Sequence, residues 1–199
     1  MIIGLTGGSG CGKTTALQVL RELGAAAFDA DAVYRELLRS DRELLDALDR
    51  AFPGAVVNGE LQRKALAKVV FQDPQKLATL NAITHPRVRE AIRSGIQSAR
   101  RQGAKLFVID AFGLMEGNLG SLCDHTVAVL APREARISRL ILRDKITRQE
   151  AERRLNAQKS DREFSEACEF TLYNCGTEEE FRQQCRSFFA AFINKEETT

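Results

Sequence analysis

The stretch "IIGLTGGSGCGKTT", residues 2–15, decides the fold of this chain. Its first five residues are apolar or β-prone and run directly into glycines, which is typical of a buried strand that enters a tight turn. The segment "TTALQVLRELG" follows with leucines at helical spacing and ends at Gly24. The stretch therefore predicts a strand, a glycine-rich loop and a helix in immediate succession.

The loop matches the pattern G-x-x-x-x-G-K-[ST]. Its glycines let the backbone turn tightly, so that N–H groups and the helix N-terminus hold phosphate oxygens. Lys13 is expected to reach the β- and γ-phosphates, and the Thr14 hydroxyl to bind the Mg²⁺ that bridges them. The strand–loop–helix context disfavours a turn with a chance lysine. We expect a nucleoside triphosphate to be bound by Gly8, Ser9, Gly10, Cys11, Gly12, Lys13, Thr14 and Thr15.

The rest of the chain alternates further strand candidates with helices, which predicts an α/β fold. Residues 25–31, 105–111, 125–131 and 169–174 are the strand candidates, and residues 32–103 are almost wholly helical. We expect one domain over residues 1–199, a P-loop NTPase with a mostly parallel five-stranded sheet flanked by helices. Its parts are a core (about 1–31, 104–132 and 166–199), a helical substrate-binding insertion (about 32–103) and a helical lid (about 133–165).

The composition and charge of the chain indicate which classes of partner it binds. The chain has 199 residues, a net charge of +2 and five cysteines without the spacing of a zinc site. Residues 133–162 carry ten Lys or Arg against five Asp or Glu, which suits a small polyanion better than nucleic acid. Without a signal peptide or an apolar run near ~20 residues, we expect free thiols, a cytoplasmic location and no membrane partner.

Two aspartates lie at the C-terminal end of the second strand candidate, at the sheet edge that the glycine loop also leaves. Asp29 or Asp31 could take the proton of an attacking hydroxyl, or both could be turn and cap residues. Asp110 ends another strand candidate and is either an outer acceptor for Mg²⁺ and its waters or a strand-end cap.

Basic residues gather at two further places. Arg136, Arg139 and Arg143 form one stripe of a helix, either a lid over the phosphates or an ordinary surface. His85 stands beside arginines in "THPRVRE", where it either binds a phosphate or ends a helix. No guanine-reading N-K-x-D is present, so a small-molecule kinase is favoured over a GTPase.

The chain resembles the dephospho-CoA kinase family over about residues 2–190. The resemblance rests on an ordered set of segments: "GLTGGSGCGKTT", "FDAD", "LQRKAL", "LNAITHP", "RLILRD", "NAQ" and "YNCG". It implies transfer of the γ-phosphoryl group of ATP to the ribose 3′-hydroxyl of dephospho-CoA, with Mg²⁺. Another P-loop nucleoside or nucleotide kinase, or a non-catalytic nucleotide-binding module, is the alternative. The oligomeric state is expected to be a monomer or a weak homo-oligomer.

The resemblance also implies residue roles. Asp31 matches the base, and Lys13, Arg139 and Arg143 match the catalytic cations. The positions near the adenine of ATP are Asn174 and Gly176, and those near the acceptor are Thr6, Asp29, Arg63 and His85.

The sequence departs from the family pattern at three places, one of which is Cys168-Glu169 in place of the usual Ala-Asp before the last strand. "DAFGLME" lacks the proline that often follows the strand, and Cys11 stands where serine is common. A helix N-terminus lowers the pKa of a thiol, so we expect Cys11 to be alkylated or oxidised readily unless ATP shields it.

Overall fold

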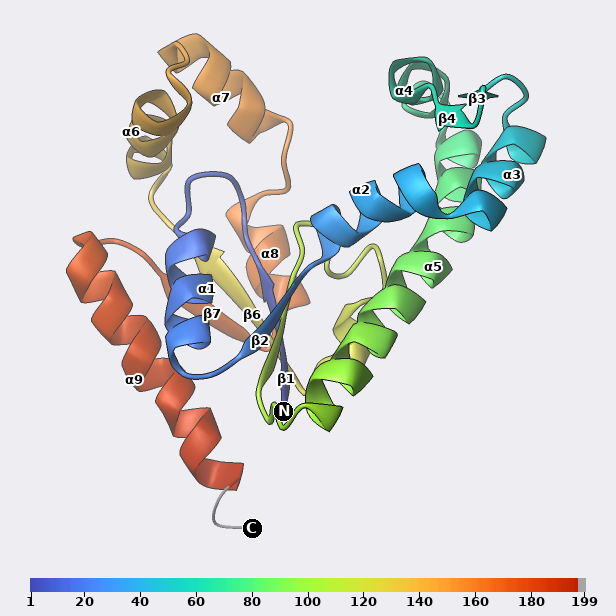
Figure 1. Ribbon diagram of the computed structural model, residues 1–199. Coiled ribbons are helices and arrows are strands. Elements are labelled where there is room, and N and C mark those ends of the chain that lie inside the picture. Colours follow the sequence, from blue (N-terminus) through green and yellow to red (C-terminus); the bar gives the residue numbers. More distant parts are fainter. Residues whose placement is uncertain (197–199) are drawn as a thin grey trace.

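A central sheet of five parallel strands organises the molecule (Figure 1). The computed structural model describes residues 1–196. In spatial order β2-β5-β1-β6-β7, the first strand of the chain lies in the middle and every pairing is parallel. The expected five-stranded parallel sheet is therefore confirmed. Its strands are β1 (Ile2–Thr6), β2 (Ala26–Asp29), β5 (Phe107–Asp110), β6 (His125–Leu130) and β7 (Phe170–Tyr173).

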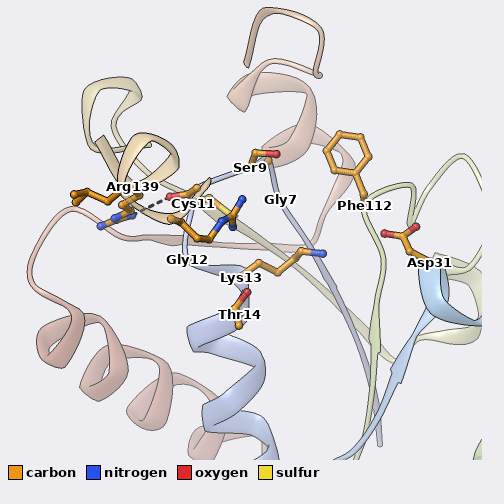
Figure 2. A pocket seen from close by; sticks show the side chains of 13 residues that line it. Gly7, Ser9, Cys11, Gly12, Lys13, Thr14, Asp31, Phe112 and Arg139 are labelled. Atoms are coloured by element: carbon orange, nitrogen blue, oxygen red, sulfur yellow. Dashed lines mark hydrogen bonds between the residues drawn. The ribbon is translucent and has the colours of Figure 1, made fainter. Parts of the chain in front are cut away.

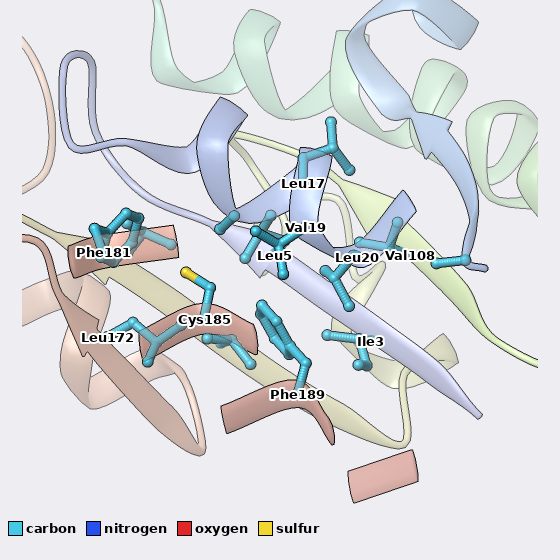
Figure 3. Packing of buried hydrophobic residues seen from close by; sticks show 14 of the residues in the cluster. Ile3, Leu5, Leu17, Val19, Leu20, Val108, Leu172, Phe181, Cys185 and Phe189 are labelled. Carbon is cyan, nitrogen blue, oxygen red and sulfur yellow. The ribbon is translucent and has the colours of Figure 1, made fainter. Parts of the chain in front are cut away.

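One face of the sheet is covered by α1 (Lys13–Glu22) and α9 (Glu178–Glu196) (Figure 3). Side chains alternate along a strand, and Ile3 and Leu5 of β1 both lie in the buried cluster on this face. Phe181, Cys185 and Phe189 recur every four residues on α9, which places them on one stripe of the helix. This packing fixes α1, and with it the end of the glycine loop, to the centre of the sheet.

The opposite face is covered by the second half of α5 (Pro74–Arg101) and by α8 (Asp161–Ala167). Ile92 and Ile96 of α5 pack with Phe107 and Ile109 of β5. Phe164 of α8 packs on the β6 side of the same face. A short 3-10 helix, η1 (Gly120–Leu122), precedes β6.

The insertion after β2 has a hydrophobic cluster of its own, which includes Leu44, Leu48 and Leu66. It contains α2 (Ala30–Ser40), α3 (Arg42–Ala51), a hairpin of β3 (Val56–Val57) and β4 (Glu60–Leu61), and α4 (Arg63–Val70). The first half of α5 completes it. Because α5 runs unbroken through Pro86, one helix joins the insertion to the sheet.

The segment expected to be a lid begins with two helices, α6 (Arg133–Asp144) and α7 (Arg148–Asn156). They pack on each other through Ile137, Leu140, Ala151 and Leu155. Figure 1 shows them on one side of the glycine loop, with the insertion on the other side. Among the described helices, none has the length and apolar character needed to cross a membrane.

Candidate active site

The glycine loop, which joins β1 to α1, forms the floor of a cavity of about 780 Å³ (Figure 2). Side chains from three other parts of the chain complete its wall, so it lies where the core, the insertion and the lid segment meet. The lining residues are Gly7, Gly8, Ser9, Gly10, Cys11, Gly12, Lys13, Thr14, Asp31, Phe112, Arg139, Leu142 and Arg143.

The N-terminus of α1 is open to an anion. No side chain caps it and its first turn holds no acidic residue, whereas aspartates cap α2, α3 and α5. Gly12 precedes the helix with φ of 103°, and a Cβ there would lie 2.2 Å from the Asn174 amide nitrogen. Free N–H donors and the positive end of the helix dipole therefore face the cavity, as a phosphate site requires.

Lys13 extends from this loop toward the insertion side of the cavity, and Figure 2 shows Asp31 beyond it. Its ammonium group donates a hydrogen bond to Asp110 at the end of β5. The expected place of Asp110 at the strand end is confirmed, but its direct partner here is the lysine. Asp29 ends β2 and is paired in register with Asp110, so three carboxylates gather at one sheet edge.

The two aspartates of "FDAD" have different positions. Asp29 caps α2, because its carboxylate accepts a hydrogen bond of 2.8 Å from the Ala32 N–H. Asp31 lies in the first turn of that helix and lines the cavity. Partial burial raises the pKa of Asp31; the charges of Asp29 and Asp110 also raise it, and Lys13 opposes them. The structure thus assigns the cap to Asp29 and leaves Asp31 free to meet a ligand.

The lid-side arginines have different surroundings. Arg139 donates to the Gly10 carbonyl and to the Asn174 amide oxygen, each at 3.1 Å, and lines the cavity. Arg143 also lines it, and its hydrogen bond lowers the pKa of Asp144 to about 2. Both arginines therefore line the same cavity as the glycine loop.

Arg136 does not share that role, although it belongs to the same sequence stripe. Only 6% of it is exposed, and it donates to the Ser9 carbonyl at 2.9 Å and to Asp161 at 2.8 Å. Gln158 exchanges two further hydrogen bonds with Ser9, one with its backbone N–H and one with its hydroxyl. The expectation that all three arginines face the phosphates is therefore wrong for Arg136, which supports the loop from behind.

The acceptor-side residues are spread over several elements. Thr6 is buried at the end of β1 and donates to the Phe112 carbonyl. His85 lies on α5 and lines a smaller cavity that shares Asp31 with the main one. Arg63 begins α4 and is bonded to the Arg35 carbonyl, away from the main cavity.

Three predicted nucleotide-site residues do not line the main cavity. Thr15 lies behind Thr14 on α1, and Gly176 lies beyond β7. Asn174 is buried, and its amide donates to the Cys11 carbonyl, so it holds the loop and Arg139 together. Their contacts are with protein in this structure, and a role near the adenine stays a prediction.

The reactive thiol expected at Cys11 is a wrong prediction. The residue is 1% exposed within the core cluster, and burial raises the pKa of its thiol above the ordinary value. The hydrogen bond from the Lys13 backbone lowers that pKa, as the helix N-terminus argument assumed, but desolvation is the larger effect.

Sequence reasoning missed two apolar members of the wall. Leu142 is an exposed residue of α6, and Phe112 lies beside Asp31. Phe112 stands in the "DAFGLME" segment that departs from the family pattern, and its ring meets Phe164 edge-on at 5.8 Å. The departure from the family pattern at this position was the one sequence signal that could have drawn attention to Phe112.

Together, the parallel sheet and the loop between β1 and α1 define a P-loop NTPase fold. A family model described as dephospho-CoA kinase matches residues 1–180. Dephospho-CoA kinase of Corynebacterium diphtheriae is 33% identical over 198 residues, which cover 98% of this chain and 99% of that protein. Dephospho-CoA kinase of Moorella thermoacetica is 41% identical over 160 residues, with 79% and 76% covered.

A solved structure has the same fold. A crystal structure of a Thermus thermophilus protein superimposes with a TM-score of 0.76 at 34% identity, covering 96% of this chain and 97% of that one. The chain belongs to the dephospho-CoA kinase family. It is therefore a kinase of the last step of coenzyme A synthesis, and the alternatives of another nucleotide kinase or a non-catalytic module are not favoured.

Proposed function

We propose that this enzyme phosphorylates the ribose 3′-hydroxyl of dephospho-CoA with ATP, and that Asp31 is its general base. The observation that carries the proposal is a single cavity that has the glycine loop at one end and Asp31 at the other. A triphosphate on the loop directs its γ-phosphoryl group toward Asp31, and a hydroxyl beside Asp31 is in line to attack.

Asp31 accepts the proton as the hydroxyl oxygen bonds to the γ-phosphorus and the bond to the ADP oxygen breaks. Its raised pKa makes it a stronger base than an ordinary aspartate. Lys13 is paired with Asp110 and also lines the cavity, so its ammonium can turn to the β- and γ-phosphates without leaving the site. Arg139 and Arg143 neutralise charge from the lid side.

The residues present fit a magnesium ion. Thr14 lines the cavity in the first turn of α1, and no cluster of three metal-ligating side chains occurs in the part of the chain that the structure describes. Mg²⁺ commonly keeps its waters and binds through phosphates and one or two protein oxygens. Thr14 would hold the ion and Asp110 its waters; when bound, the ion neutralises charge on the β- and γ-phosphates.

The location and assembly are also proposed. All five cysteines are free thiols, which supports a reducing compartment such as the cytoplasm. We also propose that the enzyme acts on small molecules rather than on nucleic acid or a membrane, and that it is a monomer or a weak homo-oligomer.

An acceptor panel tests the function. ADP release would be measured with ATP and Mg²⁺ and with dephospho-CoA, AMP, adenosine or no acceptor, and the product would be identified by mass. We expect release that depends on dephospho-CoA, yields coenzyme A and stops on chelation of Mg²⁺. ADP release with AMP alone would reject dephospho-CoA as the acceptor. ATP binding without ADP release would reject the proposed kinase activity.

A further inference from the structure

A chain of cavities leads from Asp31 to the outer side of α5. A small cavity of about 130 Å³ shares Asp31 with the nucleotide cavity, and it shares His85 and Gly117 with a third cavity of about 350 Å³. This outer cavity lies between α5 and the loop that follows β5. Its lining residues are His85, Pro86, Arg89, Glu90, Arg93, Gly117 and Asn118.

Arg89 is the unusual residue of the outer cavity. Its Nε is buried without a hydrogen-bond partner, and among residues 1–196 no hydrogen bond or ion pair to its guanidinium is present. A buried hydrogen-bond donor without an acceptor costs free energy, and the cost is larger for a charged group. The surrounding fold does not offset that cost, so a ligand with acceptor oxygens is the natural partner.

Neighbouring charges are already engaged. Glu90 accepts a hydrogen bond from Ser94 and lies 3.9 Å from Arg93, so it does not satisfy Arg89. Arg87, two residues earlier on the same helix, is bonded to Glu43 at 2.6 Å and lies 3.7 Å from Asp41. The cavity therefore carries an excess of positive charge that is centred on Arg89.

We propose that Arg89, assisted by Arg93, binds the diphosphate of dephospho-CoA. The inference rests on the proposed function, because it takes the ribose 3′-hydroxyl to lie at Asp31. The diphosphate leaves the 5′ carbon of that same ribose, and the cavity chain past His85 gives it a path to Arg89. The planar guanidinium fork matches two phosphate oxygens, which explains an arginine at this place.

Steady-state kinetics of Arg89→Ala, Arg89→Lys and Arg87→Ala would test the assignment. For Arg89→Ala we expect KM for dephospho-CoA to rise about tenfold to a hundredfold, with kcat and KM for ATP nearly unchanged. Adenosine has the ribose hydroxyl but no diphosphate, so its affinity, measured as competitive inhibition of the reaction with dephospho-CoA, should not change. Arg89→Lys keeps the positive charge but loses the planar fork, so its KM for dephospho-CoA should rise less than that of Arg89→Ala.

The matched control is Arg87→Ala, which removes an arginine of the same helix that has protein partners; its KM values should equal those of the native enzyme. An unchanged KM for dephospho-CoA in Arg89→Ala would overturn the inference and leave the function intact. Equal losses with adenosine would also overturn it, because the arginine would then contact the nucleoside. If Arg89→Ala does not fold, Arg89→Lys decides, and a native KM for dephospho-CoA in that variant rejects a bidentate contact. A native enzyme inactive with dephospho-CoA would instead reject the proposed function.

Discussion

Asp31 is the residue on which the proposed chemistry depends. Asp31→Asn keeps the size and polarity of the side chain but cannot take a proton. We expect kcat to fall about a hundredfold to ten-thousandfold, the range of a lost general base, with KM for ATP little changed. Because the pKa of Asp31 is raised, the acid limb of kcat/KM against pH should lie above the range of an ordinary aspartate. Initial rates across pH would measure both effects.

Asp29→Asn is the control for that variant. Asp29 lies two residues away and caps α2, and asparagine caps helices as well as aspartate does. The control should therefore retain stability and most of kcat, with the acid limb at lower pH because the charge of Asp29 no longer raises the pKa of Asp31. A similar loss in both variants would mean that the carboxylates act through the helix start rather than through proton transfer.

The cysteines offer a second prediction at the residue scale. Cys175 is exposed, whereas burial raises the pKa of Cys11 above its ordinary value and that of Cys185 to about 12. A short treatment of the native protein with iodoacetamide, followed by peptide mass spectrometry, should modify Cys175 first. Cys11 should react only after denaturation, with or without ATP. Rapid labelling of Cys11 that ATP prevents would show that the loop opens in solution.

Two side chains show where reasoning from sequence stops at this scale. The motif correctly located Lys13 and Thr14, because the loop pattern fixes their spacing from the helix start. The orientations of Cys11 and Arg136 depend on neighbours more than a hundred residues away, such as Cys185 and Ser9. A short segment carries no signal for such contacts, and both predictions failed.

At the scale of elements, the connection after α7 is joined to the glycine loop through Gln158. Gln158→Ala removes hydrogen bonds of 2.9 and 2.6 Å to Ser9, and each such bond contributes about 1 kcal/mol. We expect kcat/KM for ATP to fall about tenfold, roughly 1.4 kcal/mol, because the loop loses its support. KM for dephospho-CoA should change much less. Steady-state kinetics with each substrate varied would show the split.

Gln149→Ala is the matched control, since Gln149 is exposed on α7 itself. It should behave as the native enzyme. Ser9→Ala combined with Gln158→Ala should lose less than the sum of the single variants, because both remove the same hydroxyl–amide bond. Additive losses, or equal effects on both substrates, would contradict the proposed support.

Helix caps are local signals, because a cap and its partner lie within three residues of each other. Asp73 caps α5, and Thr147 and Thr177 form capping boxes with the glutamates three residues later. The hairpin of β3 and β4 was missed, because strands of two residues give no periodicity. Ser160 forms a further capping box by the same rule.

At the scale of the whole molecule, the sheet order brings the site together. β5 is inserted between β2 and β1, so Asp110 comes to lie beside the loop and beside Asp29. The alternation of strands and helices predicted a parallel sheet, but it does not specify which strands are neighbours. That order depends on long-range pairing, and the cavities of the acceptor side follow from it.

The C-terminal helix α9 supports α1, the helix that carries Lys13 and Thr14. Phe189 of α9 is fully buried in the cluster that holds α1 on the sheet. Phe189→Ala should lower the free energy of unfolding by about 3–5 kcal/mol, a large part of the roughly 5–15 kcal/mol typical of a domain. Urea unfolding followed by circular dichroism would measure the change.

Phe71→Ala is the same substitution at a residue that is 76% exposed, and it should cost less than about 0.5 kcal/mol. Equal costs at both positions would show that the burial of Phe189 does not stabilise the fold.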